Sequence, residues 1–456
     1  MQLKSVLIVS VVIAAAAAVG YGVGPLPLLL VVGGGLGLVL SAALLRPDSS
    51  SRSEESALEE SPERGWLGSM TGYVWAGLAL RLVGAVVVNA TPLWLSFGPD
   101  SMTWERYGQQ MLSSWSNPSR YGPSLSEVLG GQLFFPGLNA IAIALFGSAR
   151  YPVSLLNAFG GVACAIAGGR LTYELYGAQA AKRTLLLILF YPSLILWSTM
   201  NIREVWAHLG ILLVLIAGHN VRRRLAPLSM LVLLASLLLV YFSRPYLLSL
   251  LGVSVVGSLL VVRVRQLPYA LTTLVILGLL AQQYGDVLGV RQTLLTEESL
   301  ETIQDLRTGL AYGGSAYGAD VDTSSFTKAL LYLPQGVVTF LFAPFPWSVR
   351  SWQQALAAPE SMAFFVVFVL AMQQVIKDLR RNASEVILPL LTIVSLTCAY
   401  GLVSGNEGTA FRHRAQIAVV VFVFSGARMV GRARERKLGR AQPDPRASTL
   451  SVPSKS

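Results

Sequence analysis

Residues 97–114 read FGPDSMTWERYGQQMLSS and lie between two apolar runs. In a chain that is 53% hydrophobic and only 13% charged, this stretch holds Asp100, Glu105 and Arg106 close together, just after an apolar run. Asp100 follows a proline and is placed to cap a short helix whose next turns carry Trp104, Tyr107 and two methionines, a mixture that suits a membrane surface. The stretch therefore predicts an outer-face loop with a short interfacial helix.

The rest of the chain is strongly apolar. Its mean hydropathy is +0.58 over 456 residues, which excludes an ordinary soluble globular domain. A membrane helix needs about 20 mostly apolar residues, and the sequence supplies roughly 12 such runs. Their apolar residues are continuous rather than alternating with a period of two. These features predict an all-α polytopic membrane protein with roughly 11–13 transmembrane helices.

The net charge of +11 comes from short basic clusters between the apolar runs. The clearest clusters are His219–Arg224, Arg263–Arg265, Lys377–Arg381 and Arg428–Arg440. Because cytoplasmic loops of membrane proteins are enriched in Lys and Arg, these clusters mark the cytoplasmic side. The charge therefore indicates a multi-pass protein of the cytoplasmic (plasma) membrane and gives no reason to expect nucleic-acid binding.

Composition shifts divide the chain into four parts. We expect a transmembrane hairpin at 1–46, although the first 20 residues also resemble a signal peptide, and a Ser- and Glu-rich disordered cytoplasmic linker at 47–69. A transmembrane body is expected at 70–430, followed by a basic cytoplasmic tail at 431–456.

Two parts of the body do not fit a simple alternation of spans. Apolar runs occur at roughly 131–147, 151–168, 184–199 and 204–218, and four full crossings would place the basic cluster after them on the wrong side, so one run is expected not to cross. The segment Leu333–Trp352 contains three prolines and is expected to be interfacial or re-entrant. The last two runs are expected to bracket an outer loop, Ser404–Arg414.

This topology gathers charged residues on the outer side, where arginine is normally depleted. Arginines there point to an anionic ligand such as a lipid phosphate, which a guanidinium grips with two parallel bonds. Simpler interpretations remain open, because Asp100 could be only a helix cap and Arg244 a residue that snorkels to the boundary. Cys164 and Cys398 lie in apolar runs without metal-ligand spacing, and no metal site is predicted.

Positions 97–219 resemble the C-type (GT-C fold) polytopic membrane glycosyltransferases, which include protein O-mannosyltransferases and aminoarabinose transferases. The similarity lies in the order of GPDSMTWERYGQQM, FFPGLNAIAIALFGSARYPVSLLNAF and LILFYPSLILWSTMNIREVWAHLGILL. Later segments, FSRPYLLSLL, FAPFPW and GTAFRHR, are also similar to those of membrane glycosyltransferases. Where the family carries His or Lys followed by two prolines, this chain has FFPG at 134–137.

The resemblance implies a GT-C-like body and transfer of a sugar from a polyprenyl-phosphate donor to a hydroxyl group of a glycan, lipid or protein by inverting displacement. It places the catalytic aspartate at Asp100 and implies no metal and no cofactor other than the lipid-linked donor. Residues expected to bind substrate are Glu105, Arg106, Tyr107, Arg203, Glu204, Arg244, Arg412 and His413.

Three other functions remain open from the sequence. A polymerase or ligase of lipid-linked glycans would use the same outer site with two large substrates. A transporter or flippase of lipid-linked material would be expected to carry ionisable residues near the middle of the membrane, together with an internal repeat. A non-catalytic structural membrane protein is the last alternative.

Overall fold

The computed structural model describes residues 65–116, 134–223, 227–261, 297–310, 316–318 and 321–441. The predicted hairpin at 1–46, most of the linker at 47–69 and the tail beyond Ala441 lie outside these residues. The described part is nearly all helical. Its helices are η2 (Gly68–Met70), α3 (Thr71–Ala90), α4 (Leu93–Phe97), α5 (Asp100–Ser116), α7 (Phe134–Phe146), α8 (Arg150–Tyr176), α9 (Ala178–Phe190), α10 (Pro192–Trp197), α11 (Glu204–Arg223), α12 (Pro227–Ser243), α13 (Pro245–Leu260), α15 (Glu297–Leu310), α16 (Phe326–Phe342), η5 (Pro346–Ser348), α17 (Trp352–Val403) and α18 (Glu407–Ala441).

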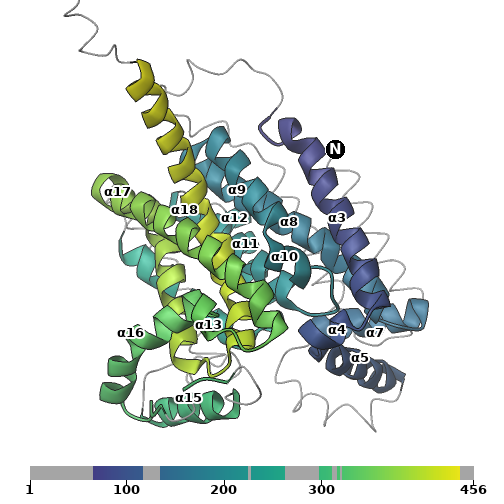
Figure 1. The fold of residues 1–456 in the computed structure, drawn as a ribbon. Helices are drawn as coiled ribbons and strands as arrows, with labels where there is room; N and C mark the ends of the chain where they lie inside the picture. Colours follow the sequence, from purple (N-terminus) through teal and green to yellow (C-terminus); the bar gives the residue numbers. More distant parts are fainter. Residues whose placement is uncertain are drawn as a thin grey trace, which may run out of the picture.

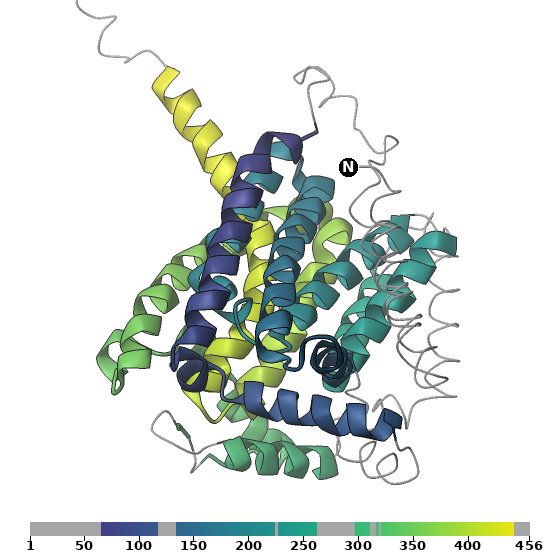
Figure 2. The same cartoon turned by 90° about the vertical axis from the view of Figure 1, so that its right-hand side faces the viewer.

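Five helices of the described part are long and apolar enough to cross a membrane. They are Gly68–Ala90, Arg150–Tyr176, Glu204–Arg223, Trp352–Val403 and Glu407–Ala433. The long helices form a bundle, and α5 and α15 lie across its lower end in both Figure 1 and Figure 2. This arrangement agrees with a membrane protein that carries a helix across one end, as the sequence predicts for the stretch that begins at Asp100.

Helix α7 is the apolar run that does not cross the bundle. Its middle packs on α5 so closely that a Cβ added to Gly108 would lie 2.6 Å from the Cβ of Asn139. Just beyond its end, the Glu105 carboxylate of α5 accepts a hydrogen bond from the backbone N–H of Ala149 at 3.1 Å. Both contacts lie at the end of the bundle occupied by α5 (Figure 1). Helix α8 then crosses, α9 and α10 return and α11 crosses again, which carries the basic Arg222 to the opposite end.

The region after residue 326 also follows the expected path. Helix α17 changes direction at Asn382, whose backbone is non-helical (φ −158°, ψ 63°), directly after the basic cluster Lys377–Arg381. Helix α16 is continuous through Pro334 and packs on the final turn of α17, where Gly336 meets the Gly401 backbone. Gln354, near the start of α17, donates a hydrogen bond to Glu407 at the start of α18, so these two helices begin at the same end of the bundle. The re-entrant path of Leu333–Trp352 stays a prediction.

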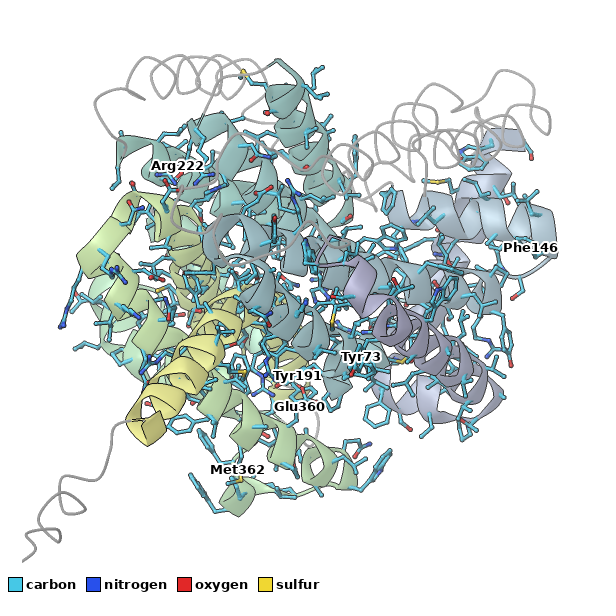
Figure 3. The ribbon with its side chains drawn as sticks, turned by 90° about the horizontal axis from the view of Figure 1, so that it is seen from above. Tyr73, Phe146, Tyr191, Arg222, Glu360 and Met362 are labelled. Carbon is cyan, nitrogen blue, oxygen red and sulfur yellow. The ribbon has the colours of Figure 1, made fainter. Side chains whose placement is uncertain are left out.

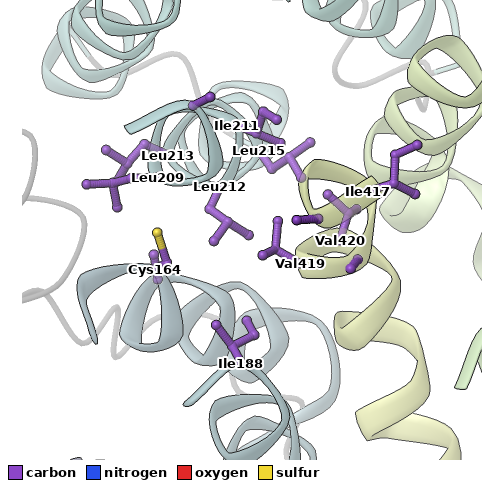
Figure 4. Close-up of a cluster of buried hydrophobic side chains, with 14 of the residues drawn as sticks. Cys164, Ile188, Leu209, Ile211, Leu212, Leu213, Leu215, Ile417, Val419 and Val420 are labelled. Atoms are coloured by element: carbon purple, nitrogen blue, oxygen red, sulfur yellow. The ribbon is translucent and has the colours of Figure 1, made fainter. Parts of the chain in front are cut away.

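Side chains of α8, α9 and α18 pack around α11 and form the centre of the core with it (Figure 4). Leu212 of α11 and Val419 of α18 are fully buried, and Cys164 of α8 is 3% exposed. A helix that is apolar on all sides belongs in the interior, because it has no face to give to water. Helix α11 is therefore held by packing on every side, and this packing also fixes the position of its first turn, which begins at Glu204.

Arg81 is an exception to the expected placement of charges at membrane boundaries. It lies in the middle of α3, is fully buried, and donates hydrogen bonds to the carbonyls of Gly77 (3.1 Å), Ile188 (3.1 Å) and Leu189 (2.7 Å). The last carbonyls of a helix have no partner within the helix, so a cation at the end of α9 satisfies them. We conclude that Arg81 joins α3 to the end of α9.

The break between α9 and α10 is also held by contacts with α17. Pro192 opens α10, because its missing N–H and fixed φ suit a first helical position. Tyr191 and Glu360 lie close together in Figure 3, and the Tyr191 hydroxyl contacts the Glu360 carbonyl at 3.5 Å. The Glu360 carboxylate accepts a hydrogen bond from the Ser193 backbone N–H at 2.9 Å, which ties α10 to α17.

We expect the two ends of the bundle to face opposite compartments. In a background without Cys164 and Cys398, a membrane-impermeant maleimide should label M102C and W347C from outside intact cells, because these residues are 58% and 83% exposed at the α5 end. Leu379, beside the α17 kink, is 42% exposed, and L379C should be labelled only after permeabilisation. Labelling of all three positions from the same side would contradict this topology.

Candidate functional site

The segment 198–203, between α10 and α11, is a buried loop whose backbone groups are bonded by asparagine side chains. The side-chain amide of Asn157 of α8 donates to the backbone carbonyls of Met200 (2.7 Å) and Ile202 (2.8 Å). Its Oδ1 accepts a hydrogen bond from the Trp206 indole at 2.9 Å. Asn89 of α3 donates to the Thr199 carbonyl at 3.2 Å. Since buried backbone groups need partners, these bonds fix the loop that delivers Glu204.

Glu204 is the first residue of α11 and is only 2% exposed. Its Oε2 accepts a hydrogen bond from Nη2 of Arg244, and its Oε1 lies 3.1 Å from Nε of Arg412. A carboxylate at a helix N-terminus is favoured by the helix dipole, and two guanidinium groups offset the cost of its burial. Glu204 is thus a shared anion between two arginines from different helices.

Arg244 precedes Pro245 at the start of α13 and is 3% exposed. Besides Glu204, its Nη1 donates to the Tyr246 hydroxyl at 2.5 Å and lies 3.1 Å from Nε2 of His413. The His413 ring stacks on Tyr400, with 4.7 Å between centroids. These contacts fix the plane of the Arg244 guanidinium, so the group acts as a preorganised cation.

Arg412 connects this buried cluster to the surface. Its Nη1 donates to Oδ2 of Asp100 at 2.7 Å, and the Asp100 side chain is 43% exposed whereas that of Arg412 is 17% exposed. Asp100 is the first residue of α5, as the sequence predicts. The structure therefore brings Asp100, Glu204, Arg244, Arg412 and His413 together from three different helices and the start of α13.

Arg203 completes the cluster on the α5 side. Its guanidinium lies over the Trp104 ring, 4.5 Å from the centroid, and its Nη1 donates to the Ser243 carbonyl at 3.2 Å. Burial, and then the neighbouring Arg244, lower the pKa of Arg203 to about 10. The guanidinium remains charged at neutral pH, and the neighbouring Glu204 carboxylate partly offsets this lowering of its pKa.

Within the part of the chain that the structure describes, the cluster holds more arginines than carboxylates. Its arginines are Arg203, Arg244 and Arg412, and its carboxylates are those of Asp100 and Glu204. Several arginines beside a solvent-accessible carboxylate are suited to an anionic ligand that also presents a proton to be removed. Among the described residues, no group of three or more His, Cys, Asp and Glu side chains could hold a metal ion.

Three predicted substrate-binding residues of α5 make other contacts. The Glu105 carboxylate accepts hydrogen bonds from Ser148 (3.0 Å) and Ala149 (3.1 Å) and so holds the start of α8. Arg106 is exposed and lies over the ring of its neighbour Tyr107, at 5.9 Å. A rotation of about 100° per residue turns Glu105 and Arg106 away from the face that carries Asp100 and Trp104. Tyr107 stays on that face, and its ring contacts that of Trp104 with 5.9 Å between centroids. Their role in substrate binding stays a prediction.

The expected outer loop Ser404–Arg414 is largely helical, because α18 begins at Glu407. Arg412 and Arg414 are therefore separated by roughly 200° around the helix. Arg414 faces the other way and donates to the carbonyls of Leu341 (2.9 Å) and Ala343 (3.0 Å), which fixes the end of α16. Arg414 therefore lies apart from the cluster that contains Arg412.

Sequence reasoning missed the asparagines that hold the 198–203 loop. Asn201 donates to Asn139 at 2.7 Å, and both are fully buried together with Asn157. The available signal was a polar amide inside an apolar run, which is costly unless it is hydrogen-bonded.

No family model, no curated protein and no solved structure matches this chain.

We expect Glu204→Gln to lower stability by about 3–5 kcal/mol, because it leaves two largely buried guanidinium groups without their shared anion. The measurement is the thermal unfolding midpoint of the purified protein in one detergent. Asp322→Asn is the matched control, since it makes the same change in an exposed ion pair with Lys328 and should leave the midpoint unchanged. Equal midpoints for Glu204→Gln and the parent chain would refute the shared-anion role.

Proposed function

We propose that this chain is a membrane glycosyltransferase that moves a sugar from a polyprenyl-phosphate donor to an acceptor hydroxyl. The observation that carries the proposal is the solvent-accessible Asp100 carboxylate, 2.7 Å from Arg412 at the edge of a cluster of arginines. The proposal also rests on the resemblance of positions 97–219 to C-type glycosyltransferases.

The chemistry needs a base and a cation at adjacent points. Asp100 would take the proton of the acceptor hydroxyl while that oxygen forms a bond to the anomeric carbon of the donor. The bond between the anomeric carbon and the phosphate oxygen breaks, and the polyprenyl phosphate leaves with the electron pair. Arg412 and Arg203 would stabilise the negative charge that develops on the phosphate.

The location of the cluster supports a lipid-borne donor. It lies at the end of the bundle where α5 runs across the helices, so a phosphate at the membrane boundary would meet the arginines while its hydrocarbon chain remained among lipids. Glu204 and Arg244 are buried behind this point and would position Arg412 without touching the sugar. A polymerase or ligase of lipid-linked glycans would use the same groups with a larger acceptor.

The test uses the whole chain in native-like membranes. We expect it to release free polyprenyl phosphate from at least one member of a panel of polyprenyl-phosphate hexoses and pentoses, as detected by mass spectrometry. Asp100→Asn should reduce the rate by about 10²–10⁴-fold, the usual contribution of a general base. Asp322→Asn, which changes an exposed carboxylate of an ion pair outside the cluster, should retain the parent rate.

Two results would count against the proposal. A parent rate in Asp100→Asn would remove Asp100 from the role of base. Movement of the intact lipid-linked sugar across the membrane, without release of polyprenyl phosphate, would favour a carrier instead.

A further inference from the structure

We propose that the outer edge of the Arg412 guanidinium is an oxyanion site, which the chain fills with its own Asp100 carboxylate until a phosphate group displaces it. The oxyanion site follows from the contacts of Arg412 alone. The identification of its ligand as a lipid phosphate rests on the proposed function. Nη1 of Arg412 would alternate between two partners, the Asp100 carboxylate and a phosphate group.

The two carboxylates on Arg412 are unlike each other. Glu204 contacts the inner Nε at 3.1 Å, is 2% exposed and is also bonded to Arg244. Asp100 contacts the outer Nη1 at 2.7 Å and is 43% exposed. The inner contact therefore fixes the direction of the guanidinium, and the outer contact is open to competition from solvent.

The energies favour displacement of Asp100 rather than Glu204. A solvent-exposed ion pair contributes about 0–1 kcal/mol, so the loss of the Asp100 contact is inexpensive. Removing Glu204 would leave buried guanidinium groups unpaired, which costs several times more. A phosphate group has more oxygen acceptors than a carboxylate and is bound by guanidinium groups through strong charge-assisted bonds.

Displacement needs no movement of helix α5. The helix is held by the Glu105 bond to Ala149 and by the close packing of Gly108 on Asn139. Asp100 is the first residue of α5, and its side chain alone would have to rotate. The exchange is therefore a local event at the rim of a rigid site.

The exchange would order the reaction. While Oδ2 of Asp100 accepts the hydrogen bond from Arg412, only Oδ1 is open to a proton from an acceptor hydroxyl. Arrival of the phosphate frees Oδ2 at the moment when the cation receives its ligand. The donor would thus open both oxygens of the base, whereas an acceptor hydroxyl that arrived first would find one of them bonded to Arg412.

The test is the affinity of the full-length protein in nanodiscs for farnesyl phosphate and for inorganic phosphate. If Asp100 competes with the ligand, Asp100→Asn should tighten farnesyl phosphate binding by about two- to five-fold, which corresponds to an exposed ion pair of up to about 1 kcal/mol. Asp100→Glu keeps a carboxylate and should stay near the parent affinity. Arg412→Gln and the milder Arg412→Lys should both weaken binding.

The result that overturns the inference is an Asp100→Asn variant that folds with the parent's thermal midpoint but binds farnesyl phosphate with equal or lower affinity. An equal gain for inorganic phosphate supports an oxyanion site that recognises the phosphate alone, and a gain for farnesyl phosphate only supports a lipid headgroup site. Tighter binding by Asp100→Asn together with an absence of sugar release in the parent chain would retain the oxyanion site and reject the transferase.

Discussion

A single buried carboxylate, that of Glu204, determines how the rest of the site is arranged. It contacts Arg244 and Arg412, which come from distant parts of the chain, and it is nearly inaccessible to solvent. Charged groups in such a place are stable only as a set, because each loses more hydration than one partner can replace. The start of α11, the turn before α13 and the first turns of α18 must therefore meet at one point.

The bundle meets this requirement by burying α11 more completely than any other of the five described membrane-length helices. The helix is enclosed on all sides, and the loop before it is bonded to side chains from α3, α7 and α8. Burial decreases from there towards the surface, from Arg244 to Arg412 and then to the exposed Asp100. Stabilisation of a developing charge needs cations that are held in place, which suits the buried arginines. Proton transfer needs a carboxylate that can reach its partner, which suits the exposed Asp100.

The sequence predicted the parts of this arrangement that depend on local pattern. The start of α5 at Asp100 follows from Pro99 and the polar stretch after it, and the change of direction in α17 follows from the basic cluster at 377–381. The partnership of Asp100 with Arg412 depends on tertiary packing across 312 residues, which a single sequence does not encode in any local signal. The opposite directions of Arg412 and Arg414 did not follow from the sequence, because the stretch Ser404–Arg414 was expected to be a loop and α18 begins within it at Glu407.

The distances along the chain also set an order of assembly during synthesis. Glu204 and Arg244 are 40 residues apart and can pair as soon as α12 and the turn after it have been made. Asp100 must wait for the final helix, because its partner lies 312 residues downstream. Since chains emerge from the ribosome N-terminus first, the inner half of the cluster forms early and the outer half last. Completion of the cluster coincides with insertion of α18, so a partly synthesised chain in the membrane does not yet hold the outer pair of Asp100 and Arg412.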